Sequence, residues 1–241
     1  MGGHLTLRSA HLIVPYAAAG VAALAAWGWL AGAALAGPHV HVVGWGGFGL
    51  AVAMWQAMIV AMMAPVVAPW MATYVKLLPA GEGAAAGGAF WFAAGYFLVW
   101  LAYSAAAATL QLALQQLGLM IAGVARQPIA AAVLVGAGAA QFMPLKRACL
   151  THCRNPMSYL IARWHDGPPS GLRLGAVHGA YCLGCCWLLM VTGLAVGIMN
   201  LAWMAVLTVV LAVEQTAPRG EWVGRAFGAV LVAWGAWSLV R

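Results

Sequence analysis

The sequence predicts an all-α fold, a polytopic bundle of about seven transmembrane helices with a cytoplasmic N-terminus. Of its 241 residues, 65% are hydrophobic and only 6% are charged, so most of the chain must face lipid or other membrane helices. The mean hydropathy is +0.93. Long runs of Ala, Leu, Val and Gly satisfy their backbone hydrogen bonds as helices, whereas a barrel needs alternating strands. We expect one integral membrane domain over residues 1–241.

Seven apolar segments are the expected spans. The first exceeds the apolar core of a signal peptide, although Ala34-Leu35-Ala36 resembles a cleavage site, so we expect it to be retained. Abundant Gly and Ala allow these helices to pack closely. The predicted spans lie at about 12–35, 47–74, 89–117, 128–142, 174–197, 201–215 and 222–240.

The longest polar stretch, residues 144–173, is expected on the cytoplasmic side. Within it, residues 156–164 alternate apolar and basic side chains, which favours a short interfacial helix. If the loops alternate between two sides, one side holds Arg8, Lys76, Lys146, Arg147, Arg154, Arg163, Arg173, Arg219 and Arg225, and the other holds Arg126 and Arg241. Basic residues concentrate in cytoplasmic loops, so we expect a multi-pass protein of the bacterial inner (cytoplasmic) membrane with its C-terminus outside. These loops also account for the net charge of +7, and no nucleic-acid partner is expected.

The segment HGAYCLGCCW, residues 178–187, indicates chemistry most strongly. On a helix, His178, Cys182, Cys185 and Cys186 fall at i, i+4, i+7 and i+8, so an imidazole and three thiols share one face. Thiolate sulfur and imidazole nitrogen are ligands that Cu(I) and Zn(II) prefer. A lone cysteine in a membrane helix is usually a packing residue, but three within five positions favour a metal site.

A second cysteine pair follows the fourth predicted span, in CLTHCRNP. Cys149 and Cys153 are four positions apart with His152 beside them, so a helix places both sulfurs on one face. They either turn toward Cys182 or remain unpaired cytosolic thiols. Five cysteines in two clusters do not form the framework of a secreted disulfide protein.

Methionines form a third group of soft ligands, in the second predicted span. Met54, Met58 and Met62 recur at i, i+4 and i+8. Thioethers usually fill gaps in a core, but prolines follow, and a proline-interrupted membrane helix often borders a cavity. At about 1.5 Å per residue, Met62 and Cys182 lie at similar depths in the inner half of the bilayer. Thiolate and thioether together would select Cu(I) over Zn(II).

Other features of the sequence are weaker signals of function. His39 and His41 form a His-x-His pair in an outer loop that suits Cu(II) or Zn(II). Glu214, near the end of the sixth predicted span, is expected to snorkel or to pair with Arg219 or a neighbouring basic residue. No P-loop, dinucleotide fingerprint or nucleophile elbow occurs, so a nucleotide-driven pump is not predicted, and whether the chain is an enzyme stays open, with a non-enzymatic role favoured.

Four motifs in order resemble a known family. AMMAP, PLKRACLTHCRNP, HGAYCLGCCWLLM and GIMNLAWM, spread over about residues 50–218, resemble a bacterial family of uncharacterised integral membrane proteins described as predicted metal-binding. The resemblance implies a polytopic helical protein with a metal site and no assigned reaction. The ligands that it implies are Cys149, Cys153, His178, Cys182, Cys185 and Cys186.

The leading hypothesis is a membrane protein that binds Cu(I), with Zn(II) as the alternative ion, and handles copper, transfers it or inserts it into a membrane or soluble partner. Its primary ligands would be His178, Cys182, Cys185 and Cys186, with Cys149 and Cys153 as cytoplasmic donors and Met54, Met58 and Met62 as a softer relay. Two alternatives stay open. One is thiol–disulfide exchange across the membrane, in which Cys182 and Cys185 cycle with Cys149 and Cys153. The other is an accessory structural subunit of a larger membrane complex, with inert thiols.

Overall fold

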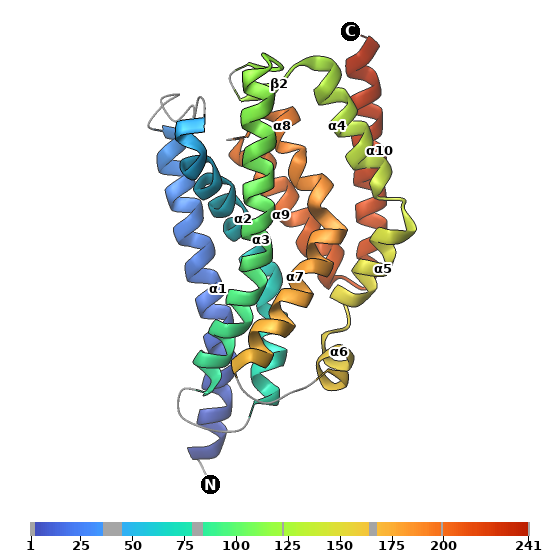
Figure 1. The fold of residues 1–241 in the computed structure, drawn as a ribbon. Coiled ribbons are helices and arrows are strands. Elements are labelled where there is room, and N and C mark those ends of the chain that lie inside the picture. Colours follow the sequence, from blue (N-terminus) through green and yellow to red (C-terminus); the bar gives the residue numbers. More distant parts are fainter. Residues whose placement is uncertain are drawn as a thin grey trace.

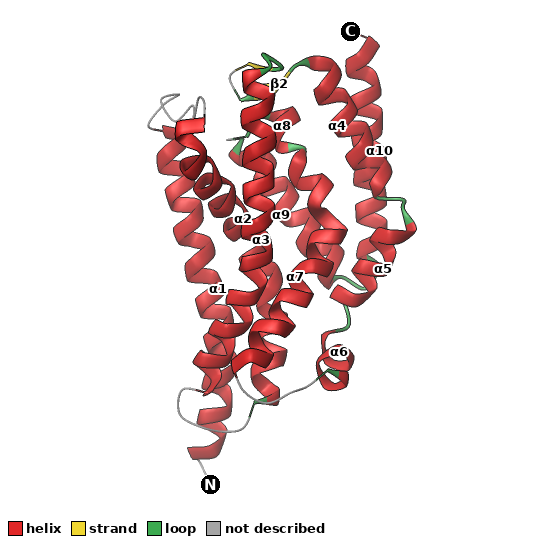
Figure 2. Ribbon diagram, viewed as in Figure 1, coloured by secondary structure: helices red, strands yellow, loops and turns green. Residues whose placement is uncertain are grey.

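The computed structural model describes residues 3–35, 45–78, 84–121, 123–163, 168–198 and 200–240. Most of this part of the chain is helical, as Figure 2 shows, and the all-α prediction is confirmed. The elements are α1 (Gly3–Leu35), η2 (Trp45–Gly47), α2 (Phe48–Leu77), α3 (Ala84–Gln116), β1 (Met120–Ile121), β2 (Val124–Ala125), α4 (Gln127–Ala140), α5 (Pro144–Cys153), α6 (Pro156–Ala162), α7 (Pro168–Val191), α8 (Gly193–Val196), α9 (Leu201–Thr216) and α10 (Gly220–Val240). The strands β1 and β2 form a short antiparallel hairpin.

Five helical segments are long and apolar enough to cross a membrane. They lie in α1, α2, α3, α7 with α8, and α10. A sixth candidate is the pair α4 and α5, which bends by 63° at the break. The predicted span at 201–215 corresponds to α9, whose 16 residues reach about 24 Å, less than a hydrocarbon core of about 30 Å. The structure therefore supports five or six candidate spans, and the predicted count of about seven is not confirmed.

The polar stretch differs from its prediction. Residues 144–173 contain α5, α6 and the first six residues of α7, which begins at Pro168 instead of near residue 174. Proline is tolerated in a first helical turn because an N–H group there has no acceptor within the helix. A helix is present within the predicted 156–164 segment as α6, which ends at Ala162, while Trp164 lies outside the described residues. Its place at a membrane interface stays a prediction.

The helices form one bundle, in which α2 packs against α1, α3, α6 and α9 (Figure 1). The closest pairs are α3 with α7, α1 with α2, and α4 with α10. Figure 1 places the N-terminus and α6 at one end of the bundle, and the C-terminus with the β hairpin at the other. Most of α2 is buried, including Trp55, Met62 and Trp70, so this helix is the centre of the core.

Glycines allow the backbones of α7 and α3 to pack closely together. A Cβ on Gly95 would lie 1.9 Å from the carbonyl oxygen of Leu172, and a Cβ on Gly175 would lie 2.0 Å from that of Phe92. The two backbones can approach this closely only where no side chain intervenes. This contact fixes α7, and therefore the thiol-bearing face of α7, relative to the core.

Candidate metal centre

Three thiols form a compact cluster on α7. The sulfur atoms of Cys182, Cys185 and Cys186 all lie within 4.8 Å of one another, and all three residues are buried. Positions i, i+3 and i+4 of a helix share one face, which explains why the sequence brings them together. We call Cys182, Cys185 and Cys186 the thiol triad.

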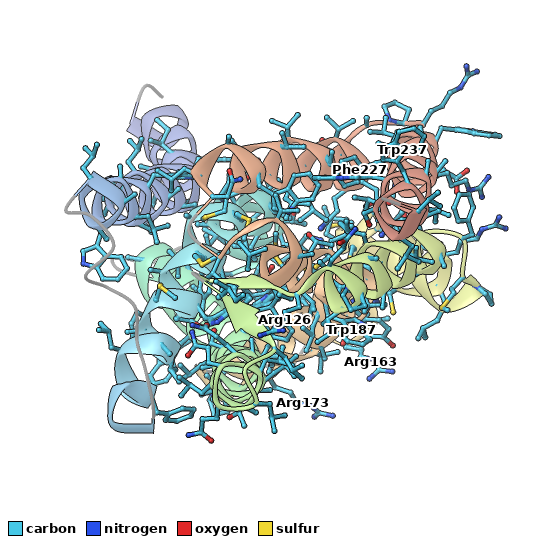
Figure 3. The ribbon with its side chains drawn as sticks, turned by 90° about the horizontal axis from the view of Figure 1, so that it is seen from above. Arg126, Arg163, Arg173, Trp187, Phe227 and Trp237 are labelled. Atoms are coloured by element: carbon cyan, nitrogen blue, oxygen red, sulfur yellow. The ribbon has the colours of Figure 1, made fainter. Side chains whose placement is uncertain are left out.

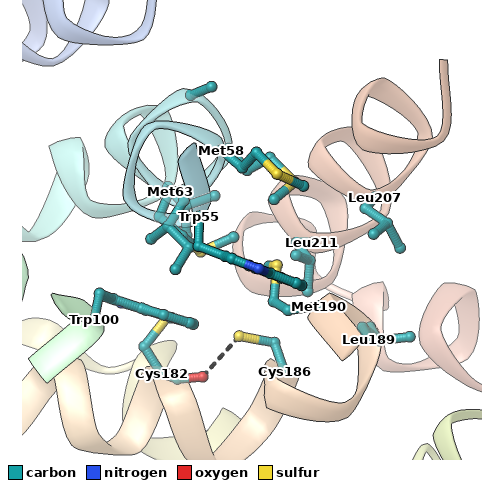
Figure 4. Close-up of a cluster of buried hydrophobic side chains, with 14 of the residues drawn as sticks. Trp55, Met58, Met63, Trp100, Cys182, Cys186, Leu189, Met190, Leu207 and Leu211 are labelled. Atoms are coloured by element: carbon teal, nitrogen blue, oxygen red, sulfur yellow. Dashed lines mark hydrogen bonds between the residues drawn. The ribbon is translucent and has the colours of Figure 1, made fainter. Parts of the chain in front are cut away.

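Hydrogen bonds distinguish the members of the triad. The thiols of Cys185 and Cys186 donate to the carbonyl oxygen of Cys182, at 3.0 and 2.9 Å, and Figure 4 draws the second of these bonds. The sulfur of Cys182 lies 3.1 Å from the Tyr96 hydroxyl, and the Gln215 amide donates to it at 3.8 Å. Cys182 is therefore the triad member with polar partners on two other helices, α3 and α9.

The two cysteines of α5 lie beside the triad. A Cβ on Gly184 would stand 2.9 Å from the sulfur of Cys149, so this thiol rests directly against α7. The thiol of Cys153 interacts with those of Cys182 and Cys185. Both α5 cysteines are buried, and all five cysteines are free. The structure thus gathers five thiols from two helices in one place.

His178 lies one turn before the triad, at the centre of an aromatic stack. Its ring centroid is 3.9 Å from that of Trp70 and 5.4 Å from that of Tyr96. Trp70 also donates to the carbonyl oxygen of Cys153 at 2.7 Å, which ties α2 to α5 beside the site. His178 is fully buried, and neither ring nitrogen has a hydrogen-bond partner among the described residues. Such a group costs about 1–3 kcal/mol unless a ligand satisfies it, and a metal ion can do so.

His152 is a second imidazole at this site, which the sequence did not single out as a ligand. Its ring lies 6.3 Å from that of His178 and 3.7 Å from that of Tyr181. Its Nε2 atom is buried and has no hydrogen-bond partner in the described part of the chain. The signal that could have found it is its position between Cys149 and Cys153. His39 and His41, the other predicted pair, lie outside the described residues.

Comparison with known proteins agrees with this sulfur-rich geometry. A family model named PpoB2 and described as a copper chaperone matches residues 52–238. The chain belongs to the PpoB2 copper chaperone family. The match runs from α2 to α10 and includes all five cysteines, whereas α1 lies before it. The predicted membership of a metal-binding family is confirmed. No curated protein and no solved structure matches the chain.

The methionine ladder of this PpoB2 chain is buried in the core near the thiols. Met54, Met58 and Met62 are only 2–3% exposed. In Figure 4 the Trp55 ring lies between Met58 and the pair formed by Cys182 and Cys186. Met190, one helical turn after Cys186, belongs to the same cluster and was not singled out from the sequence.

A buried ion pair borders the triad of this PpoB2 chain. The Lys146 ammonium lies 2.6 Å from a carboxylate oxygen of Glu214, with side chains that are 6% and 2% exposed, and it also donates to Gln141. A cavity of about 80 Å³ is lined by Gln141, Lys146 and Cys185 among others. Glu214 was expected to snorkel or to pair with Arg219 or a neighbouring basic residue. Its partner is instead Lys146 on α5, so an ammonium group shares a cavity with Cys185 of the triad.

Proposed function

We propose that this PpoB2-family protein binds Cu(I) within the membrane at its thiol triad and delivers the ion to a partner protein. The observation that carries the proposal is the convergence of three sulfur atoms within 4.8 Å on α7, with the thiols of α5 beside them. Cu(I) prefers thiolate and thioether sulfur to oxygen ligands. The family description, a copper chaperone, supports copper as the cargo.

The donors divide into three groups. Cys182, Cys185 and Cys186 bind the ion first. His178 lies outside this group, one turn before it, and is a further donor because neither of its ring nitrogens has a hydrogen-bond partner among the described residues. Cys149 and Cys153 exchange the ion with the triad from the α5 side. Met54, Met58 and Met62 form a softer relay on α2, separated from the triad at Met58 by the Trp55 ring. Three thiolates and one imidazole also suit Zn(II), so the identity of the metal has to be measured.

More sulfur donors than one ion needs are a useful property in a chaperone. A Cu(I) ion bound by the triad can pass to Cys153 by replacing one sulfur ligand with another, because Cys153 interacts with two triad members. Copper keeps its oxidation state throughout, and each thiol that binds releases one proton. The same exchange with soft ligands of a partner protein completes the delivery.

We infer that the chain crosses the bacterial inner membrane as one domain, with its N-terminus and the α5–α6 end in the cytoplasm. The two termini lie at opposite ends of the bundle, which requires an odd number of crossings (Figure 1). Counting α9 as a short crossing and α4 with α5 as another gives seven. Basic residues in cytoplasmic loops support this orientation.

The test is Cu(I) loading of the purified full-length chain in detergent under reducing conditions. We expect about one copper ion per chain and sulfur scattering in its X-ray absorption spectrum. The double variant Cys182→Ser with Cys185→Ser loses the ion. Val191→Thr, a substitution of equal size on the same helix, keeps it. A wild-type chain that stays metal-free, or a double variant that binds copper fully, contradicts the proposal, and preferential loading with zinc contradicts the choice of metal.

A further inference from the structure

The cavity of about 80 Å³ beside the buried ion pair also reaches the surface of the bundle. Its wall contains Met143 and Trp187, which are 50% and 44% exposed, and Cys185, which is 4% exposed. Trp187 is labelled in Figure 3. Cys182 and Cys186 are not among the described residues that line it. Because half-exposed and buried side chains share one wall, the cavity connects the outside of the protein to Cys185 of the thiol triad.

The position of Met143 follows from the break between α4 and α5. Met143 precedes Pro144, and the residue before a proline is disfavoured in the helical conformation. Its backbone is accordingly extended, with φ −68° and ψ 142°, and the axes of the two helices bend by 63° here. Figure 1 shows this bend on the outside of the bundle. The break therefore places a flexible thioether at the surface end of the cavity.

The size and charge of the cavity suit the passage of a Cu(I) ion. One water molecule needs about 10–15 Å³ of cavity, so a single metal ion has room. The Lys146 ammonium in the wall lies 2.6 Å from a carboxylate oxygen of Glu214, so this pair adds no net charge. Leu145 and Leu189 make part of the wall apolar. An ion that leaves water here needs a soft donor, and the thioether of Met143 is a ligand that Cu(I) accepts.

We propose that Cu(I) reaches and leaves the thiol triad through this cavity, and that Met143 is the surface donor that passes the ion to Cys185. The inference rests on the proposed function, because it takes the triad as the place where the ion is held. As the ion enters, the bond from copper to the Met143 sulfur breaks while the bond to the Cys185 sulfur forms. The Cys185 thiol gives its proton to water, and copper stays Cu(I). Met143 is absent from the final site, so it sets the rates of loading and release and not the affinity.

The first experiment compares rates with affinity in the full-length chain. Cu(I) is supplied as its acetonitrile complex, and stopped-flow absorption of the copper–thiolate bond follows loading, and then release into excess bicinchoninate. We expect Met143→Leu to slow loading and release by the same factor, about tenfold, and to leave Kd unchanged. Met157→Leu changes another half-exposed methionine, on α6 and outside the cavity wall, and should match the wild type. Wild-type rates in Met143→Leu, or slowing with a changed Kd, overturn the proposal.

The second experiment needs no copper. Methyl methanethiosulfonate, a small neutral reagent, converts a thiol to a mixed disulfide and releases methanesulfinate, and peptide mass spectrometry gives the rate at each cysteine. We expect Cys185 to react before Cys182 and Cys186, and Ala140→Leu, which fills the cavity, to slow Cys185 selectively. Ala139→Leu, the same change at an exposed neighbour outside the wall, is the control. Equal rates at the three triad cysteines, or equal effects of the two leucines, overturn the proposal. A wild-type chain that stays copper-free contradicts the proposed function, whereas copper loading with equal thiol rates contradicts only the passage through this cavity.

Discussion

The sulfur of Cys149 lies 2.9 Å from the point that a Cβ on Gly184 would occupy. The α5 thiol reaches the triad face of α7 at this point because residue 184 has no side chain. Glycine inside a helix costs about 1 kcal/mol relative to alanine, so its presence between Cys182 and Cys185 serves the contact and not the helix.

Gly184→Ala should therefore displace the Cys149 thiol and leave the fold intact. The new methyl group meets only the end of a side chain, which can rotate away. We expect Cu(I) affinity, measured by competition with a colorimetric chelator, to fall by about tenfold because one sulfur donor is lost. Gly136→Ala is the control, since a Cβ there meets nothing within 4 Å. Unchanged affinity in Gly184→Ala would remove Cys149 from the copper site.

Gly175→Ala should act on the fold itself. Here the new methyl group would lie 2.0 Å from the backbone oxygen of Phe92, which no rotamer change can relieve. We expect a loss of stability of about 1–3 kcal/mol or more, seen as a lower melting temperature in detergent. Gly87→Ala, in open space on α3, should melt as the wild type does. A Gly175→Ala chain with normal melting would mean that the α3–α7 approach is not tightly constrained.

The spacing of residues along single helices predicts much of this fold and of the thiol triad. The apolar runs of the long helices are visible in the sequence, and positions i, i+3 and i+4 place the sulfurs of Cys182, Cys185 and Cys186 on one face. The methionine ladder is equally periodic, and Met58 is buried in the core as a helical stripe predicts. The sequence does not predict that the Trp55 ring lies between Met58 and the triad, because spacing along one helix does not reveal which of its side chains faces the neighbouring helix.

Long-range pairing explains what the sequence did not reveal. From the sequence, Lys146 is predicted to lie in a cytoplasmic loop. In the structure it pairs with the buried carboxylate of Glu214, which lies 68 positions later in the chain. The 63° bend between α4 and α5 brings this lysine and Cys149 into the protein instead of leaving them in a polar loop. The role of His152 likewise depends on rings that other helices provide, such as that of Trp70.

Removing one member of the buried ion pair should be costly. Lys146→Met leaves the Glu214 carboxylate buried without its cation, and breaking such a pair costs about 3–5 kcal/mol. We expect a large fall in melting temperature. Adding Glu214→Gln should restore part of it, because the uncompensated charge is then gone. Arg225→Met is the control, since its pair with Glu221 is longer, at 3.7 Å, and more exposed, and should contribute about 0–1 kcal/mol. Equal effects of Lys146→Met and Arg225→Met would contradict the prediction.

Copper itself should stabilise the chain, and less so as the pH falls. An ion that binds only the folded state stabilises it by about 2.7 kcal/mol at a free concentration of 100 times its Kd. The thiols of the triad must lose their protons to bind, so protons compete with Cu(I) and the stabilisation shrinks toward acidic pH. The measurement is the melting temperature with and without Cu(I) across a pH series, followed by reversal with a chelator. Cys182→Ser with Cys185→Ser should show no shift at any pH, because the sulfur atoms that bind the ion are then missing. A shift of equal size in that variant would place the copper elsewhere on the chain.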